Sequence, residues 1–265
     1  MKYLRGFMMA WGMFCRIPCP YKAWREEDRP AQLAMLPLVG ACIGGICSLL
    51  WWGMSWMECG AIIMGAILTG AYFLLTGFIH LDGFMDCSDA VMPEHPDMEE
   101  RRRILKDPHV GAFAAICLAL MLLVFASAWC TVASEFNPAL AGTIISMFTL
   151  SRMAGVVTLM TSEPMPTSQY ATAGKDGENA VPITVAVLIA AALTVVTMII
   201  SGEGICRGAV PGLPAVVVVA AVTVGTALLT GFLDRQKLGG MSGDISGHMI
   251  TISEMCGMAV LTLFI

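Results

Sequence analysis

Long runs of apolar residues dominate the sequence, and they restrict the possible folds more than any other feature. A helix needs about 20 mainly apolar residues to cross the hydrocarbon core of a bilayer. Seven runs approach or exceed that length, at residues 31–57, 61–79, 110–133, 138–161, 180–201, 209–233 and 247–265. The sequence therefore predicts an all-α fold, a polytopic integral membrane bundle with about seven transmembrane helices.

Residues 6–15 form a shorter apolar run behind a basic start. This run is too short to span a bilayer. Residues 16–20, which follow it, contain Arg and Pro instead of the small-residue cleavage site of a signal peptide. We therefore expect an N-terminal interfacial or re-entrant segment that stays part of the protein.

The composition supports a membrane protein and excludes several other classes. Hydrophobic residues make up 57% of the 265-residue chain and charged residues 13%, whereas a soluble domain has roughly 45–50% and about 25%. This balance excludes a water-soluble globule and a disordered chain. The net charge of −5 excludes a nucleic-acid partner, because phosphate binding needs a basic face. No linker divides residues 1–265, so we expect a single integral membrane domain in a lipid bilayer.

The ten cysteines lie mostly in apolar runs, and no pair has the C-x-x-C spacing of a zinc or redox site. We interpret all ten as reduced packing residues. Nothing in the sequence specifies an oligomeric state.

Basic residues are divided unequally between the two sides of the predicted topology. With the N-terminus inside, the N-terminal segment and the loops 80–109, 162–179 and 234–246 carry thirteen of the fifteen Lys and Arg residues. The other side carries Arg207, and Arg152 lies within a span. Because cytoplasmic loops carry an excess of Lys and Arg, this division supports both the number of spans and their orientation.

Three aspartates, Asp82, Asp86 and Asp89, follow the second apolar run. At about 100° per residue, the spacing i, i+4, i+7 places all three on one helical face, and His80 points away from it. Carboxylates this close repel one another, so either their pKa values rise or a cation neutralises them. Oxygen ligands suit Mg²⁺, Ca²⁺ or Mn²⁺. The pattern favours a divalent-cation site over a solvated acidic turn.

A second polar cluster occupies the glycine-rich stretch 239–248. Its glycines allow sharp turns or a close approach of the backbone to a ligand. If a helix starts near Asp244, then Asp244, His248 and Thr251 share a face. The stretch is cytoplasmic in the predicted topology, so we expect Asp244 to meet the three aspartates. For His248 alone we favour a position in the core.

Basic residues near these clusters are candidate phosphate ligands. The triplet 101–103 is as typical of a membrane anchor as of a ligand, whereas Lys106 and Asp107 lie directly before the next span. Arg152, inside an apolar run, either pairs with an acidic side chain or binds substrate phosphate. Aspartates, a divalent cation and basic residues at a membrane surface together indicate phosphoryl-group chemistry, with a carboxylate as proton acceptor.

Several motifs together resemble the adenosylcobinamide-GDP ribazoletransferase family, also called cobalamin synthase. They are His80-Leu81-Asp82-Gly83 with Asp86 and Asp89, segment 103–111, the glycine-rich segment 239–247, segment 14–18 and Ser151-Arg152. The resemblance covers about residues 5 to 255.

This resemblance implies a Mg²⁺-dependent transferase of cobalamin biosynthesis, multi-pass in the bacterial inner membrane, with its active site facing the cytoplasm. In the family, a ribose hydroxyl of α-ribazole or its 5′-phosphate attacks the pyrophosphate of adenosylcobinamide-GDP. GMP leaves, and adenosylcobalamin or its 5′-phosphate forms. The lower base and the phosphorylation state of the acceptor are not specified by the sequence.

The resemblance also implies roles for individual residues. The metal would be held by Asp82, Asp86, Asp89 and Asp244. The catalytic group would be Asp82, Asp86, Asp89 and Asp107, with Asp89 or Asp107 as the base. The substrate phosphates would be bound by Arg16, Arg103, Lys106 and Arg152.

The chain departs from the family pattern at Thr251, where the family often has an acidic residue, with another at Glu254. One hypothesis is that His248 compensates. Two other functions stay open. A CDP-alcohol phosphatidyltransferase is disfavoured because the chain lacks the D-x-x-D-G-x-x-A-R pattern, and a secondary transporter because the acidic residues cluster at one membrane side instead of the midplane.

Overall fold

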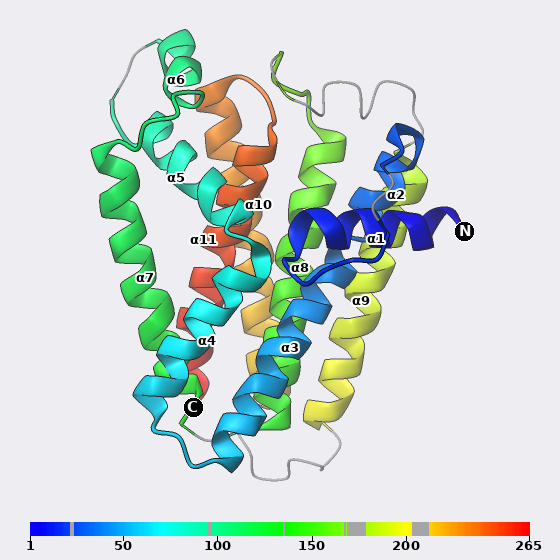
Figure 1. Ribbon diagram of the computed structural model, residues 1–265, viewed down its shortest axis with the longest axis vertical. Helices are drawn as coiled ribbons and strands as arrows, with labels where there is room; N and C mark the ends of the chain where they lie inside the picture. Colours follow the sequence, from blue (N-terminus) through cyan, green and yellow to red (C-terminus); the bar gives the residue numbers. More distant parts are fainter. Residues whose placement is uncertain (22–23, 95–96, 135, 167, 169–178, 203–211) are drawn as a thin grey trace.

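Six helices of the described chain are long and apolar enough to cross a membrane, and they stand side by side in one bundle (Figure 1). They are α3 (Leu36–Trp56), α7 (Ala112–Val132), α8 (Pro138–Thr161), α9 (Ala180–Gly202), α10 (Leu213–Leu238) and α11 (Gly243–Leu261). This computed structural model describes all residues except 22–23, 95–96, 135, 167, 169–178 and 203–211. The prediction of an all-α membrane bundle is confirmed.

Helix α8 forms the centre of the bundle. In its most apolar part 78% of the residues are buried, compared with 22% in α9 and 28% in α10. Packing against α3, α9, α10 and α11 surrounds α8 with protein. The Ala- and Val-rich helices α9 and α10 therefore leave most of their surface for lipid, as expected for the fifth and sixth predicted spans.

The second predicted span differs from the expectation. Helix α4 (Ala61–Thr76) has 16 residues, and a bend of 91° separates it from α5 (Ile79–Val91). Gly77 and Phe78, both at φ 62°, form the bend between the two helices. The pair counts as a seventh span only if it is one broken crossing. The expected loop 80–109 is thus largely helical, because it contains α5 and α6 (Met98–Ile104).

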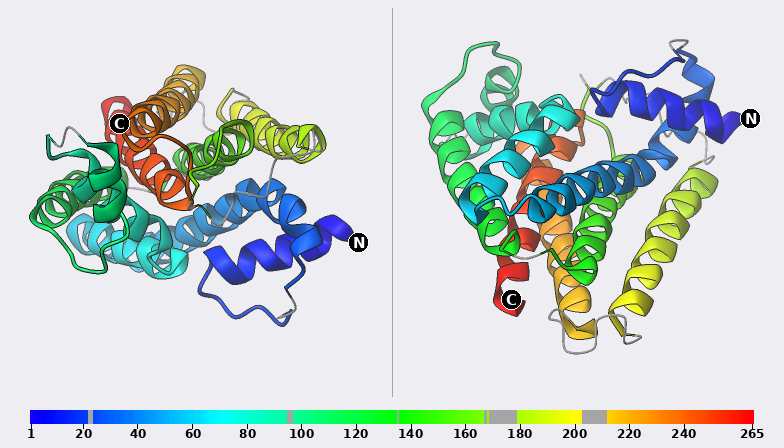
Figure 2. Two further views of the ribbon diagram at one scale, coloured as in Figure 1. Left: turned by 90° about the horizontal axis from the view of Figure 1, so that it is seen from above. Right: turned by 60° about the horizontal axis from the view of Figure 1, so that its bottom comes forward.

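The N-terminal segment lies across the bundle, as Figures 1 and 2 show for α1 (Lys2–Phe14). The first predicted span, 31–57, is interrupted at Met35, where α2 (Arg29–Ala34) gives way to α3. Asp28 is buried and accepts a 2.7 Å hydrogen bond from Arg5 Nε, which joins α1 to the segment before α2. This contact lowers the pKa of Asp28 below its ordinary value.

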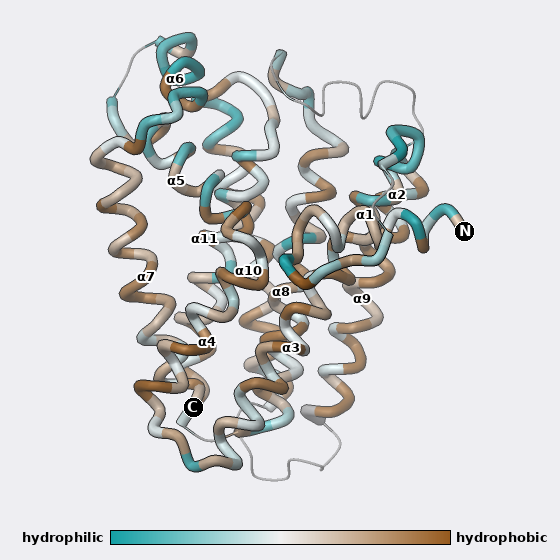
Figure 3. The backbone as a smooth tube through the Cα atoms, viewed as in Figure 1, coloured by the Kyte–Doolittle hydropathy of each residue, from teal (hydrophilic) through white to brown (hydrophobic). Residues whose placement is uncertain are grey.

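Polar residues gather at one end of the bundle, where α5, α6, the end of α10 and the start of α11 meet (Figure 3). Helix α10 extends to Leu238, beyond the predicted end at 233, and α11 begins at Gly243 instead of 247. Gly239, at φ 72°, ends α10 in a left-handed conformation. Residues 234 and 244, assigned to a loop by sequence, therefore lie on helices.

Candidate active site

The four predicted metal-binding aspartates lie in one region. Asp82, Asp86 and Asp89 belong to α5, and Asp244 lies in the first turn of α11. The negative charges of the other three act on the half-buried carboxylate of Asp86. The prediction that Asp244 meets the α5 aspartates is confirmed. We call Asp82, Asp86, Asp89 and Asp244 the carboxylate face.

Two glycines bring α5 and α11 close enough for this meeting. A Cβ atom on Gly83 would lie 2.8 Å from the backbone oxygen of Asp244, and one on Gly247 would lie 3.0 Å from that of His80. A larger residue at either position would force the helices apart, since real Cβ contacts are longer than this. The Asp-Gly and Gly-rich motifs therefore have a structural reason: their glycines allow the carboxylates to approach.

A cavity of ≈ 220 Å³ adjoins the carboxylate face. Asp82, Asp244 and His80 supply polar atoms to its wall, whereas α1, α2, α3 and α8 supply mostly apolar side chains. The apolar part consists of Met13, Phe14, Leu33, Leu36, Ile79, Val156 and Leu159. A site with one acidic wall and one apolar wall suits a ligand that is itself partly charged and partly apolar.

The carboxylate face has no basic counterpart in the described part of the chain. None of the ion pairs found there includes Asp82, Asp86, Asp89 or Asp244. No three of these carboxylates have oxygen atoms within 4.8 Å of one another, so a metal ion held here would take its remaining ligands from water or substrate oxygens. Clustered oxygen donors without a protein cation fit a hard divalent ion such as Mg²⁺.

Asp89 has a further role that the sequence did not reveal. Its two carboxylate oxygens accept hydrogen bonds from the backbone N–H groups of Gly111 (2.7 Å) and Ala114 (2.8 Å), at the start of α7. Asp89 thereby caps a helix far from it in sequence. Gly111 has the space for this contact because it lacks a Cβ atom.

Asp107 lies apart from the cavity wall and is 53% exposed. It accepts a hydrogen bond from the backbone N–H of His109 at 3.0 Å and contacts its ring at 2.7 Å. These contacts lower the pKa of Asp107. The structure thus places one candidate base, Asp107, outside the cavity and gives the other, Asp89, two backbone partners.

The basic triplet is divided among different partners. Arg101 donates to the carbonyl groups of Ala90 and Val91 at the end of α5, and Arg102 to those of Leu238 and Gly239 at the end of α10. Both satisfy carbonyl groups that a helix end leaves unpaired.

The predicted phosphate ligands outside the spans do not line the cavity. Arg103 is 79% exposed and pairs with Glu100 at 2.6 Å, and Lys106 is exposed nearby. The Arg16 side chain lies over Gly77, at the bend between α4 and α5, and borders a separate hollow of ≈ 350 Å³.

Arg152 occupies the interior of the bundle. It is fully buried and forms an ion pair with Glu254, which also accepts hydrogen bonds from Tyr72 and Ser151. This arrangement matches the structural alternative for Arg152, pairing with an acidic side chain, and places it away from the cavity wall. It also gives Glu254 a partner.

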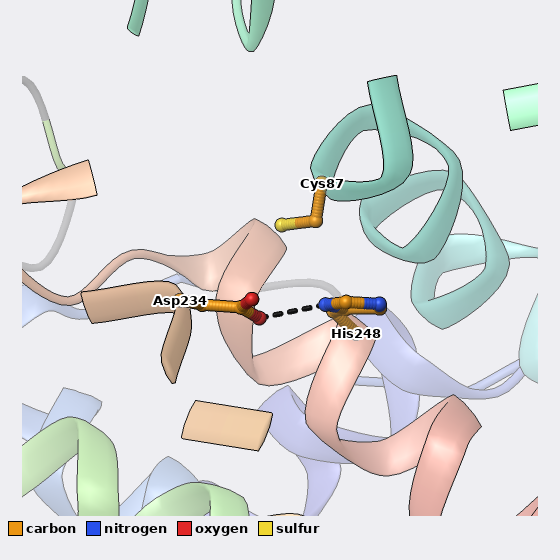
Figure 4. A group of neighbouring side chains, drawn as sticks. All are labelled: Cys87, Asp234 and His248. Atoms are coloured by element: carbon orange, nitrogen blue, oxygen red, sulfur yellow. Dashed lines mark hydrogen bonds and ion pairs between the residues drawn. The ribbon is translucent and has the colours of Figure 1, made fainter. Parts of the chain in front are cut away.

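Sequence reasoning missed two features near the carboxylate face. His80 was expected to point away from the site, yet it lines the cavity, and its buried Nε2 atom has no partner among the described residues. His248 contacts Asp234 at 2.6 Å, beside Cys87 (Figure 4). Asp234 and His248 lie seven positions before and after Met241, which is in the turn between α10 and α11. Antiparallel packing of two helices joined by this turn would have suggested their contact.

Comparisons with known proteins identify the family. A family model described as cobalamin-5-phosphate synthase matches residues 6–262. An adenosylcobinamide-GDP ribazoletransferase of Clostridium perfringens is 29% identical over 260 residues, 98% of this chain and 98% of its own.

Proteins of the same name from Lachnoclostridium phytofermentans and Shewanella denitrificans match about half of the chain. The first is 37% identical over 125 residues (47% of this chain, 48% of the relative) and the second 33% over 126 (47% and 47%). No solved structure matches. Since the family model covers almost all of the sequence, the chain belongs to the cobalamin-5-phosphate synthase family.

Proposed function

We propose that this protein is a Mg²⁺-dependent adenosylcobinamide-GDP ribazoletransferase. It transfers the adenosylcobinamide phosphate group to a ribose hydroxyl of α-ribazole or its 5′-phosphate and releases GMP. The carboxylate face without a basic partner, placed beside a cavity, is the observation that carries this proposal. Family membership favours it over a phosphatidyltransferase or a transporter.

The carboxylate face would hold the metal. Asp82 and Asp244 line the cavity. The negative charges of Asp82, Asp244 and Asp89 all act on Asp86. A bound Mg²⁺ would neutralise the charge that grows on the pyrophosphate as GMP leaves. The cavity is smaller than the roughly 300–1,000 Å³ typical of sites for drug-sized ligands, so it accommodates the reacting part of the substrates and not the whole corrinoid.

A carboxylate of this face accepts the proton of the attacking hydroxyl. Asp89 is a poor candidate for this role, because both of its carboxylate oxygens already accept hydrogen bonds from backbone N–H groups at the start of α7. Asp82, Asp86 and Asp244 are therefore better candidates than the two bases suggested by the sequence. Arg16, Arg103 and Lys106 remain the candidates for binding the exposed phosphates.

The site opens toward the cytoplasm in this proposal. The carboxylate face lies at the polar end of the bundle, together with α6 and its basic residues (Figure 3). Under the positive-inside rule, that end faces the cytoplasm. The location that follows is the bacterial inner membrane, with both soluble substrates arriving from the cytoplasm.

The test is a reaction with purified protein in liposomes. We expect GMP and joined corrinoid to form in equal amounts from adenosylcobinamide-GDP and α-ribazole, only when Mg²⁺ is present and not after chelation. Asp82→Asn should abolish both products. Glu94→Gln, which removes an exposed acidic group outside the site, is the matched control and should keep wild-type activity. Folded protein that forms no product with either α-ribazole or its 5′-phosphate would refute the proposal.

A further inference from the structure

A second group of candidate metal ligands lies beside the carboxylate face. Cys87 of α5, Asp234 of α10 and His248 of α11 point toward one another (Figure 4). One ligand atom from each lies within 4.8 Å of the other two, and all three residues are buried. Within the described part of the chain, this is the one such group of three.

The polar atoms of this group are incompletely compensated. The single hydrogen bond that the described structure gives Asp234 joins its Oδ2 to His248 Nδ1 at 2.6 Å. The other ring nitrogen, Nε2, is buried without a partner among the described residues and lies on the far side of the ring from Asp234 (Figure 4), so Nδ1 is the nitrogen that faces this group. A buried carboxylate is costly unless a positive charge or several hydrogen bonds compensate it. A bound cation would provide that charge.

The ligand types identify the class of cation. Thiolate and imidazole are the ligands of zinc and related transition metals, and a carboxylate oxygen completes many such sites. Mg²⁺ and Ca²⁺ prefer sites built of oxygen alone. The two neighbouring groups therefore differ in chemistry: the carboxylate face offers hard oxygen donors, and this group offers a sulfur, a nitrogen and an oxygen.

We propose that Cys87, Asp234 and His248 bind a zinc-class divalent cation. The ion takes the place of the hydrogen bond between His248 and Asp234 and joins three helices at one point. Because Cys87 directly follows Asp86 in α5, this site fixes α5 against the α10–α11 pair. It thereby holds the carboxylate face in position without belonging to it.

The experiment measures bound metal in full-length protein purified in detergent with an affinity tag that contains no histidine. We expect about one zinc per chain by elemental analysis. Replacing zinc with Co²⁺ should produce the near-ultraviolet absorption band of a cobalt–thiolate bond. This band tests thiolate ligation in the wild-type protein, so the result does not depend on whether a variant folds.

Variants then locate the ion. Cys87→Ser should remove the cobalt–thiolate band, and His248→Ala should remove the zinc. Cys256→Ser, which changes a cysteine of α11 outside the group, should keep both. Wild-type protein with no zinc above a detergent blank and no cobalt band would overturn the proposal. So would zinc that is lost in Asp82→Asn but kept in Cys87→Ser, because the ion would then belong to the carboxylate face.

Discussion

The molecule contains two groups of charged residues, and they differ in whether the protein itself supplies the compensating charge. In the bundle interior, the Arg152 guanidinium pairs with Glu254, and Tyr72 and Ser151 donate to the same carboxylate. At the polar end, the four aspartates of the carboxylate face have no ion-pair partner in the described structure. The first group is neutral within the protein, whereas the described protein supplies no positive charge to the second, which is why we propose that a cation binds there.

Whether a charged residue has a partner of opposite charge distinguishes structural residues from candidate functional ones better than its burial does. Charges inside a membrane protein are expensive and therefore paired, so a completed pair needs no ligand to explain it. Like charges held together without a partner are destabilising, and a fold retains them where a ligand compensates. Arg152, one of the phosphate ligands suggested by the sequence, thus belongs to the scaffold through its pair with Glu254, and the proposed chemistry lies at the polar end of the bundle.

The largest expected effect comes from breaking the balanced group. Glu254→Gln leaves the buried guanidinium of Arg152 without its anion and should destabilise the protein by about 3–5 kcal/mol. Thermal unfolding in detergent measures the loss. The double variant Arg152→Met, Glu254→Gln removes the charge as well and should recover part of it. Equal stability of wild type and Glu254→Gln would contradict the assignment of this pair to the scaffold.

At the carboxylate face, a substitution is expected to lower activity without lowering stability. Asp244→Asn should lower the rate of GMP release on the order of 10²–10³-fold, the effect of removing one preorganised electrostatic group. Its thermal stability without metal should be unchanged or higher, because a repulsive charge is gone. Loss of activity accompanied by an equal loss of stability would mean that Asp244 supports the fold instead of the reaction.

The sequence was sufficient for those parts of the fold and site that depend on local pattern. Apolar length identified the six long helices but not the bend between α4 and α5, and the spacing of Asp82, Asp86 and Asp89 identified their common face. Topology alone then brought Asp244 to that face, since both segments were placed on the cytoplasmic side.

Features that depend on contacts between distant segments could not be predicted in this way. The bend after Thr76 rests on two consecutive residues with positive φ, and Phe78 carries no sequence signal for that conformation. The partners of Asp89 are backbone N–H groups at Gly111 and Ala114, which any sequence would offer. Arg101 and Arg102 likewise bind backbone carbonyl groups, a structural role that the sequence could not distinguish from an anchor or a ligand.

A smaller effect is expected from separating the helices that form the carboxylate face. In Gly83→Ala the new Cβ would meet Asp244 backbone atoms at 2.8–2.9 Å, and overpacking of this kind costs about 1–3 kcal/mol. Activity should fall as Asp82 moves away from Asp244. Gly225→Ala in α10 meets no atom within 4 Å and should be neutral or slightly stabilising. Equal activity of the two variants would show that the close approach is unnecessary.

The smallest expected effect concerns the Arg5–Asp28 pair, which is balanced like the interior group but lies at the protein surface with Arg5 partly exposed. Arg5 lowers the pKa of Asp28 below its ordinary value of 3.8. The stabilisation is therefore complete above that value and disappears as the pH falls through the lower pKa of the folded state. Asp28→Asn should lower the unfolding temperature at neutral pH, and its difference from wild type should shrink in acid. A difference that stays constant with pH would mean that packing, and not the ion pair, holds α1 in place.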